Sequence, residues 1–235
     1  MNKIFTFKAS TFWGSIWLLL LLIPFNYSCS RKYSDSKNSF CWVENRPCLQ
    51  GKIVVAITTN KGTIQLELDG DSAPVTAGNF LDLINKGVYE QTVFHRVIRK
   101  PSPFILQAGD PFSKDPNTQE IDYGKGSFID PKTGQIRFIP LEIKLKTETL
   151  PRYNQLITNP KDISELQLVH QRGSVAMARS MRMDSGSSQF YIALKPLPVL
   201  DGRYSVFGKV VQGKEILEEI REGDIIIKTR IIKPI

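Results

Sequence analysis

The sequence predicts a mainly β domain, an antiparallel barrel or sandwich capped by helices. Three observations carry this prediction: about eight short segments are rich in β-branched and aromatic residues, only two clear stretches have helical spacing, and strand and helix do not alternate strictly. Strands that follow one another through turns pair antiparallel, whereas a parallel sheet needs a crossover connection between its strands. The chain has 235 residues, enough for one domain with additional segments, and shows no internal repeat.

The first two strands are predicted to form a β-hairpin. Residues 53–57 are a β-branched run, and residues 63–68 alternate polar and apolar side chains. The turn signal Asn-Lys-Gly at 60–62 lies between them. A helix is predicted over 74–86, because Pro is tolerated in the first turn, apolar residues recur at helical spacing and Gly87 suits the end.

Six further strands and a second, short helix complete the predicted domain. The strands are expected at 92–98, 104–108, 173–178, 189–194, 204–211 and 225–232, and the helix at 214–220. The long segment 111–172 is irregular, with a weakly alternating stretch at 137–145 and a short helical stretch at 162–169. We therefore expect a domain over 53–235 with an insertion around 111–172.

The first 29 residues are predicted to be an export signal or a membrane anchor. Lys3 and Lys8 precede an apolar run at 12–23, which is short for a membrane span. Cys29 is a candidate lipidation site, although Asn26 stands where a bacterial lipobox has an aliphatic residue. Cleavage, lipidation and retention as an anchor all remain open. We expect an exported protein, in the periplasm or a comparable lumen, with membrane anchoring through this segment as one outcome.

Residues 30–52 are predicted to be a linker or an extended arm, since Ser, Lys and Asn are frequent in them. Cys41 and Cys48 bracket a short loop in this stretch. Two nearby cysteines of an exported protein can pair, so a disulfide between them is the favoured hypothesis. Two cysteines with neither histidine close by cannot make a usual structural zinc site, and we expect no metal and no cofactor.

The charge of the chain limits its partners. The formal net charge of +8 is spread along the sequence and not gathered in a dense Lys/Arg cluster of the kind that binds nucleic acid. A solvated basic surface explains the charge, and attraction to an acidic partner or a membrane surface is the alternative. We expect a monomer without a nucleic-acid partner.

Five sequence blocks carry a resemblance to a known family. They are Phe-His-Arg-Val-Ile at 94–98, Gln-Ala-Gly-Asp at 107–110, Ser-Val-Ala-Met-Ala-Arg at 174–179, Ser-Ser-Gln-Phe-Tyr-Ile at 187–192, and Leu-Asp-Gly-Arg at 200–203 with Val-Phe-Gly-Lys-Val at 206–210. In this order they resemble the cyclophilin family of peptidyl-prolyl isomerases over about 53–232. The resemblance implies a closed eight-stranded antiparallel barrel capped by two helices, and proline-containing polypeptides as substrates.

Arg96 is the predicted catalytic residue. Rotation about a peptide bond meets a barrier of roughly 18–20 kcal/mol because the nitrogen lone pair is delocalised. A fixed cationic donor aimed at the prolyl nitrogen stabilises the twisted state more than the planar one, and arginine is permanently charged and rigid. A surface or salt-bridging arginine is the alternative. Gln107 is expected to orient Arg96 and to meet the substrate carbonyl, and its alternative is a simple hydrogen-bonded amide.

The resemblance assigns substrate binding to seven further residues. An apolar pocket for the proline ring is expected from Phe104, Ile105, Tyr191 and Leu200, whereas the backbone of Ala178, the side chain of Gln189 and Tyr204 would hold the neighbouring groups. Taken singly, each apolar residue is as readily explained as barrel core. Since the reaction transfers no proton, His95 is interpreted as a packed structural residue. His170 is expected to be exposed, and Asp110 and Asp201 are expected to cap turns.

Several departures from the family pattern motivate a second function. Val199 stands where many relatives have a Trp that contacts cyclosporin, which argues against tight cyclosporin binding. The pair Arg179-Ser180 replaces a common Asn-Ala, Ala108 replaces a common Gly, and the loop 99–103 is longer than usual. The alternative is a non-catalytic peptide-binding chaperone or scaffold that uses the same groove. A hydrolase is the weakest reading, because the serines at 187–188 lack nucleophile-elbow spacing.

Overall fold

The structure is a computed structural model that describes residues 40–43 and 45–234. The predicted export signal, its cleavage or anchoring, and lipidation at Cys29 fall outside these residues. Among the helices of the described part, none is both long and apolar enough to cross a membrane.

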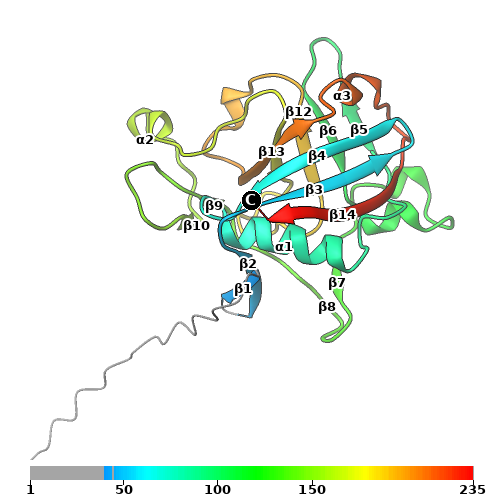
Figure 1. The fold of residues 1–235 in the computed structure, drawn as a ribbon, viewed down its shortest axis with the longest axis horizontal. Coiled ribbons are helices and arrows are strands. Elements are labelled where there is room, and N and C mark those ends of the chain that lie inside the picture. Colours follow the sequence, from blue (N-terminus) through cyan, green and yellow to red (C-terminus); the bar gives the residue numbers. More distant parts are fainter. Residues whose placement is uncertain (1–39, 44, 235) are drawn as a thin grey trace, which may run out of the picture. The chain divides into compact units, whose positions relative to one another are not determined.

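One eight-stranded antiparallel sheet dominates the molecule, in the order β14-β3-β4-β13-β11-β12-β6-β5 (Figure 1). All eight strands predicted from the sequence are present. Their bounds are β3 Lys52–Thr59, β4 Gly62–Asp69, β5 Arg96–Ile98, β6 Ile105–Ala108, β11 Ser174–Met177, β12 Phe190–Ala193, β13 Val206–Gln212 and β14 Ile226–Pro234. The mainly β, antiparallel prediction is confirmed.

The sheet is not closed by a continuous ladder, so the expectation of a closed barrel went too far. The outer strands β14 and β5 are each paired on one side only. They approach each other at a single bridge between Val93 and Ile225, supported by backbone hydrogen bonds from Phe94 to Asp224 and from Ile226 to Thr92. Because β5 has three residues and begins only at Arg96, it leaves no length for a ladder with β14.

Helix α1, Pro74–Asn85, lies against the sheet beside β14 (Figure 1) and matches the prediction closely. Its N-cap residue Ala73 offers no side-chain hydrogen bond. Instead, the carboxylate of Glu142 in β9, Glu142–Ile143, accepts the N–H groups of Val75 at 3.1 Å and Thr76 at 2.8 Å. The second capping helix is a single turn, α3 Ile216–Glu219, where a longer helix at 214–220 was expected.

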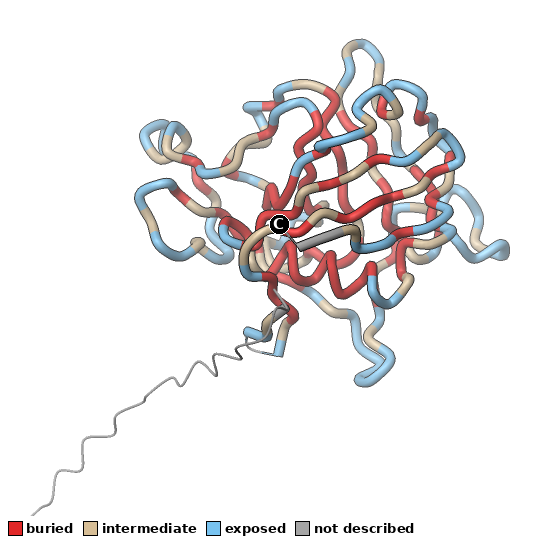
Figure 2. The backbone as a smooth tube through the Cα atoms, in the orientation of Figure 1, coloured by how far each residue is buried: buried red, intermediate tan, exposed pale blue. Residues whose placement is uncertain are grey.

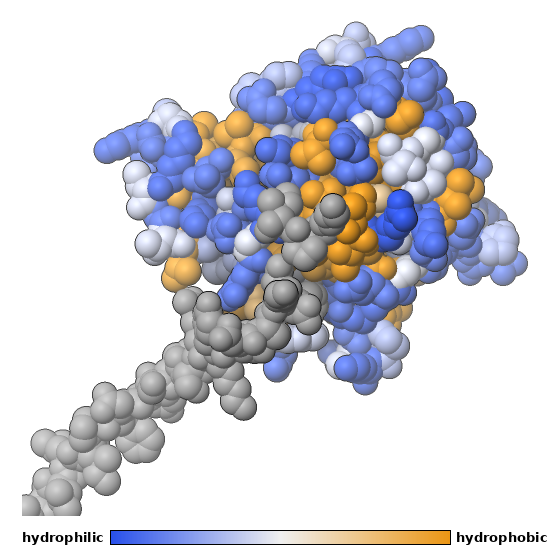
Figure 3. All heavy atoms as spheres, in the orientation of Figure 1, coloured by the Kyte–Doolittle hydropathy of each residue, from blue (hydrophilic) through white to orange (hydrophobic). Residues whose placement is uncertain are grey.

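The main core lies between α1 and one face of the sheet. Figure 2 shows buried residues along α1 and along the strands of the sheet. Four aromatic rings pack at its centre with centroids 4.8–5.5 Å apart: Phe80, Tyr89, Phe190 and Phe207. Most of the surface seen in Figure 3 is hydrophilic, interrupted by apolar patches. One face of the sheet thus packs in the main core.

Residues 40–49 are a hairpin and not the linker that was expected. Strands β1, Phe40–Val43, and β2, Arg46–Leu49, pair with Cys41 opposite Cys48, and the two sulfurs are bonded. Leu49 is fully buried in the main core. A Cβ on Gly78 of α1 would lie 2.2 Å from the Cα of Cys48, so helix and strand approach at backbone distance. The polar residues that suggested a linker lie mostly before residue 40.

The insertion 111–172 is built from short elements. They are η1 Pro111–Lys114, η2 Glu120–Asp122, β7 Ile129–Asp130, β8 Gln135–Ile136, β9, β10 Arg152–Tyr153 and α2 Pro160–Ser164. The strand expected at 137–145 is reduced to β9, and the helix expected at 162–169 is shorter and begins at Pro160. The guanidinium of Arg137 ties the insertion to α1 by an ion pair with Asp82 at 2.6 Å, and it also pairs within the insertion with Asp130 at 2.8 Å.

Candidate active site

Arg96 lies on the edge strand β5, directly opposite Gln107 of β6. Its side chain is exposed, and its Nη1 donates to Oε1 of Gln107 at 3.4 Å. The amide of Gln107 then donates to Oε1 of Gln189 at 3.0 Å. A guanidinium has five donor hydrogens, so this contact leaves others for a ligand. The sequence therefore placed Arg96 and Gln107 correctly as neighbours.

Loop carbonyls from the insertion fix the far end of this row of amides. Nε2 of Gln189 donates to the carbonyl oxygens of Gly124 at 2.9 Å and Gly126 at 2.8 Å. The buried carboxylate of Asp110 in turn accepts the N–H groups of Gly124 and of Phe112. Asp110 is thus a turn cap, as predicted. The contribution of the glycine carbonyls had no signal in the sequence, because backbone groups carry no residue identity.

The apolar residues predicted to bind proline meet in one cluster on the other face of the sheet from the main core. Alternation along β12 separates the two sides: Phe190 packs in the main core and Tyr191 in this cluster. Six predicted residues belong to the cluster: Phe104, Ile105, Ala178, Tyr191, Leu200 and Tyr204. We call this set the apolar pocket, after the proline-binding role predicted for it. Within it, Ile105 and Tyr191 are buried, while the other four are partly exposed.

The longer loop 99–103 does not remove Phe104 from the pocket. The N–H of Phe104 donates to the carbonyl oxygen of Ile98 at 2.9 Å, so the two ends of the loop are hydrogen-bonded to each other. The loop is also held from outside, since Nη2 of Arg99 donates to the carbonyl oxygen of Ile220 at 2.9 Å, just after α3. The excursion of the loop is therefore accommodated away from the pocket wall.

His170 is buried, and the expectation that it is exposed is wrong. Only 1% of its surface is accessible. Its Nδ1 lies 2.7 Å from Oδ1 of Asp201, and its Nε2 lies 2.8 Å from the hydroxyl of Tyr191. Asp201 also accepts the backbone N–H of His170 at 2.8 Å, so it binds a distant segment where a local turn cap was expected. The irregular sequence around His170 has no period that would have predicted its burial.

Burial shifts the pKa of the titratable groups around the pocket. It lowers the pKa of His170 below its ordinary value, although the adjacent Asp201 acts in the opposite direction. It raises the pKa of Tyr191 well above the ordinary value. Burial also lowers the pKa of His95, which is consistent with the packed, structural role predicted for it. At neutral pH both histidines are therefore uncharged.

Two departures from the family pattern lie at the rim of the pocket. The guanidinium of Arg179 stacks 4.9 Å from the centre of the Tyr204 ring and donates from Nη2 to the carbonyl oxygen of Arg203 at 2.7 Å. Val199, in η3 Pro198–Leu200, is 65% exposed. Arg179 therefore covers one side of Tyr204, whereas Val199 is exposed at the rim.

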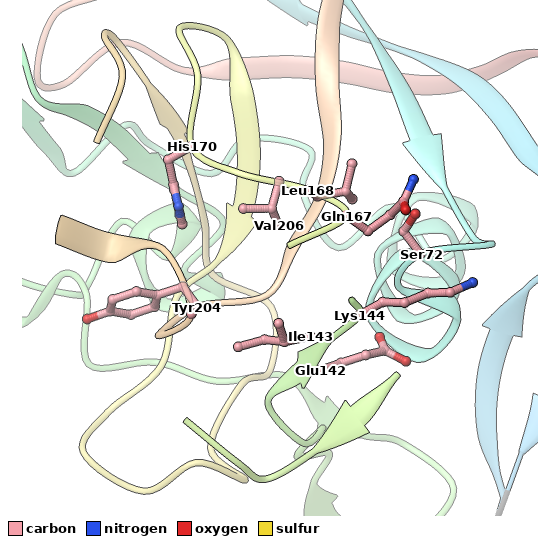
Figure 4. Close-up of a pocket in the computed structure, with 10 residues that line it drawn as sticks. Ser72, Glu142, Ile143, Lys144, Gln167, Leu168, His170, Tyr204 and Val206 are labelled. Carbon is pink, nitrogen blue, oxygen red and sulfur yellow. The ribbon is translucent and has the colours of Figure 1, made fainter. Parts of the chain in front are cut away.

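A small cavity lies next to the pocket, and Figure 4 shows His170 and Tyr204 on one side of it. Glu142, Ile143 and Lys144 of the insertion line its other side. Its volume is about 10 Å³, which admits roughly one water molecule. It is too small for a peptide. Within the described residues, no group of three His, Cys, Asp or Glu could hold a metal.

The fold and the site define a class of mainly β domain, an eight-stranded antiparallel sheet with an apolar cluster on one face beside the exposed guanidinium of Arg96. The family model described as "Cyclophilin type peptidyl-prolyl cis-trans isomerase/CLD" matches residues 54–235. The chain belongs to this family.

Individual relatives agree with the family match. A Synechocystis protein named as a thylakoid lumen peptidyl-prolyl cis-trans isomerase is 41% identical over 198 residues, covering 80% of this chain and 49% of the relative. A Helicobacter pylori peptidyl-prolyl cis-trans isomerase is 36% identical over 172 residues, covering 72% of this chain and 82% of the relative. The chain thus spans about half the length of the Synechocystis protein.

A solved structure has the same fold. The crystal structure of a Cryptosporidium parvum cyclophilin-type isomerase is 28% identical, with a TM-score of 0.57, and the match covers 77% of this chain and 98% of that one. The same protein was also solved in the presence of the dipeptide Ala-Pro, with a TM-score of 0.56.

Proposed function

We propose that this chain is a peptidyl-prolyl cis-trans isomerase that assists protein folding outside the cytoplasm. The observation that carries the proposal is the contact of Arg96 with Gln107 at the rim of the sheet face that holds the apolar pocket. Family membership and isomerase relatives support the activity. The relative solved in the presence of Ala-Pro supports a proline-containing ligand.

The proposed mechanism uses binding and polarisation alone. The proline ring enters the apolar pocket, and the guanidinium of Arg96 donates to the prolyl nitrogen as the peptide bond twists. Because the lone pair on nitrogen is available only in the twisted state, this bond lowers the barrier and not merely the energy of the bound substrate. By analogy with oxyanion donors, one such contact is worth about 2.7–4 kcal/mol. Gln107 orients Arg96 and meets the substrate carbonyl.

The remaining binding residues hold the chain on either side of the proline. Gln189, fixed by the carbonyl oxygens of Gly124 and Gly126, and the backbone of Ala178 would bind the neighbouring peptide group. Tyr204 would contact the other side of the ring. Because these contacts read a local geometry and not a long sequence, we expect many proline-containing polypeptides to be substrates, with no cofactor.

We also propose an exported location and a domain that includes the β1–β2 hairpin. The bonded pair Cys41 and Cys48 supports an oxidising compartment, and the lumenal name of the Synechocystis relative agrees with it. The periplasm or a comparable lumen is the proposed site, with cleavage, lipidation at Cys29 and anchoring as the outcomes to distinguish. We propose a monomer that binds no nucleic acid.

A peptide-binding chaperone without turnover is the second candidate. The exposed Val199, which leaves the rim open, favours it. It predicts that proline-containing peptides bind the unmodified protein but isomerise no faster in its presence.

Isomerisation of a proline-containing test peptide by the full chain tests the proposal. Arg96→Ala should lower kcat/KM by about 10²–10³-fold, as loss of an oxyanion donor does. Arg230→Ala, in the exposed part of β14, is the matched control and should retain the parent rate. An Arg96→Ala protein as fast as the parent would refute the catalytic role, and binding without turnover by the parent would favour the chaperone.

A further inference from the structure

A hydrogen-bonded row of three side chains lies behind the apolar pocket. Oδ1 of Asp201 lies 2.7 Å from Nδ1 of His170, and Nε2 of His170 lies 2.8 Å from the hydroxyl of Tyr191. The side chain of His170 is 0% exposed and that of Asp201 is 10% exposed. The three residues come from separate parts of the chain: His170 from the end of the insertion, Tyr191 from β12, and Asp201 from the turn after η3.

The chemistry of the three groups fixes the position of each proton. An ionised carboxylate only accepts, so Nδ1 of His170 carries the hydrogen that is donated to Asp201. The other nitrogen of a neutral imidazole is then an acceptor, so the Tyr191 hydroxyl donates to Nε2. Every polar group in the row is thereby satisfied in a site where an unpaired one would be costly.

The row acts on the pocket through Tyr191. The Tyr191 ring stacks parallel to His170, with an interplanar angle of 7°, and meets Tyr204 edge to face at 86°. Tyr204 is itself covered by the guanidinium of Arg179. Because its hydroxyl is hydrogen-bonded to His170, the position and the orientation of the Tyr191 ring are fixed.

We propose that His170 and Asp201 are positioning residues for proline binding, because they hold Tyr191 in the orientation in which its ring forms the floor of the pocket. This inference rests on the proposed function and adds two residues that do not touch the substrate. A phenylalanine at 191 would fill the same space without the tether. The row thus gives the pocket floor a fixed orientation that packing alone does not supply.

The row also makes proline binding depend on pH. If His170 takes up a proton, both ring nitrogens donate, so the Tyr191 hydroxyl accepts from Nε2 and no longer donates to it. Its hydrogen would then point into apolar surroundings. The titratable or charged groups that face the row are Asp201 beside Nδ1, Tyr191 beside Nε2, and Tyr204 with Arg179 beyond Tyr191. Glu142 and Lys144 line the small cavity on which His170 also borders. Asp201 favours the protonated ring, whereas burial opposes it.

A mutant series on the full chain tests the inference, with kcat and KM measured separately on a proline-containing peptide. Tyr191→Phe and His170→Leu should each raise KM by about three- to tenfold and change kcat by less than about twofold, by analogy with the loss of one buried hydrogen bond. The double variant should be no worse than the weaker-binding single variant, because both remove one bond. His170→Gln, which offers an acceptor near the position of Nε2, should recover part of the loss.

Controls separate positioning from stability and from the function itself. Tyr153→Phe removes a hydroxyl that bonds Glu142 in the insertion and should lower thermal stability without changing KM. In the parent, KM should rise as pH falls from 8 to 5.5, and this rise should be absent from Tyr191→Phe. An active parent whose KM is unchanged by Tyr191→Phe and His170→Leu, both shown to be folded by circular dichroism, overturns the inference. An inactive parent overturns the proposed function instead.

Discussion

Two glutamine side chains connect the arginine on the edge of the sheet to a loop of the insertion. Gln107 faces Arg96 with its oxygen and Gln189 with its nitrogen, and Gln189 ends on the carbonyl oxygens of Gly124 and Gly126. Each amide satisfies all its contacts in only one of its two flipped orientations. The order of donors and acceptors along the row is therefore fixed. The position of the guanidinium therefore depends on residues that do not touch it.

Gln189→Leu should lower kcat/KM for isomerisation by about tenfold. The substitution keeps the volume but leaves the amide of Gln107 without its acceptor, so Arg96 loses part of its orientation, at the cost of roughly one hydrogen bond. Gln135→Leu, at an exposed position in β8, is the matched control and should leave the rate unchanged. An equal loss in both variants would show that the polarity of the row is not important.

The buried histidines should make the folded protein sensitive to mild acid. The pKa of His170 and of His95 is lowered on folding, so the unfolded chain binds more protons below its ordinary histidine pKa of about 6.5. The two histidines therefore stabilise the folded protein fully above about pH 6.5. This stabilisation is lost as the pH falls from the pKa of the unfolded state to the lower pKa of the folded state.

Urea unfolding at pH 7.5 and pH 5 measures this effect. His170→Gln should lose less stability between the two pH values than the parent does. Burial raises the pKa of Glu142, which acts with the opposite sign in both proteins, so the comparison between parent and variant removes it. Equal losses in parent and variant would contradict the account.

Among the elements, α1 depends on a carboxylate from another part of the chain. Its N-cap residue is Ala73, which has no side-chain hydrogen bond, and Glu142 of β9 binds two of the free N–H groups. A carboxylate at a helix N-terminus also interacts favourably with the helix dipole. The insertion is thereby connected to the helix that covers the core.

Glu142→Ala should reduce the free energy of unfolding by about 1–3 kcal/mol, because the N–H groups of Val75 and Thr76 are left buried without an acceptor. Chemical denaturation of parent and variant gives this difference. Glu120→Ala, at an exposed position in η2, is the control and should change stability by less than about 0.5 kcal/mol. A neutral Glu142→Ala would mean that solvent replaces the carboxylate.

Replacing both Cys41 and Cys48 by Ser should destabilise the domain by about 2–3 kcal/mol, the chain-entropy value for a short closed loop. The effect should appear in global unfolding, because Leu49 of the same hairpin lies in the main core. Adding a reductant should bring the parent to the stability of the variant and leave the variant unchanged. No response of the parent to the reductant would show that the bond does not contribute.

For the whole molecule, local patterns predicted the strands well and long-range contacts poorly. The eight strands of the sheet have alternating polar and apolar residues or runs of β-branched residues, because each has a face in the core. This pattern can be recognised in the sequence. The burial of residues 47–49 depends on the absence of a side chain at Gly78, far along the chain. The burial of His170 likewise depends on Asp201 and Tyr191, which no local pattern connects to it.

The site followed the same rule. Arg96 and Gln107 could be paired from the sequence, because they lie on adjacent strands, and the resemblance to a family supplied the residues of the apolar pocket. What it did not supply were the backbone carbonyls that orient Gln189 and the side chains behind Tyr191. These groups act through geometry, which appears only when segments from 96 to 204 are brought together.

The pairing of β14 with β3 joins the last strand of the sheet in the sequence to the first. The two pair from Ile226 opposite Thr59 to Pro234 opposite Ile53, with two shifts of register on the way. If the chain crosses a membrane unfolded and N-terminus first, β14 arrives after every other strand. During that interval β3 has an unprotected edge, to which another chain could add. Completion of the domain would therefore be an event that follows translocation, and a chain delayed in the pore would be at risk of aggregation until its final strand arrived.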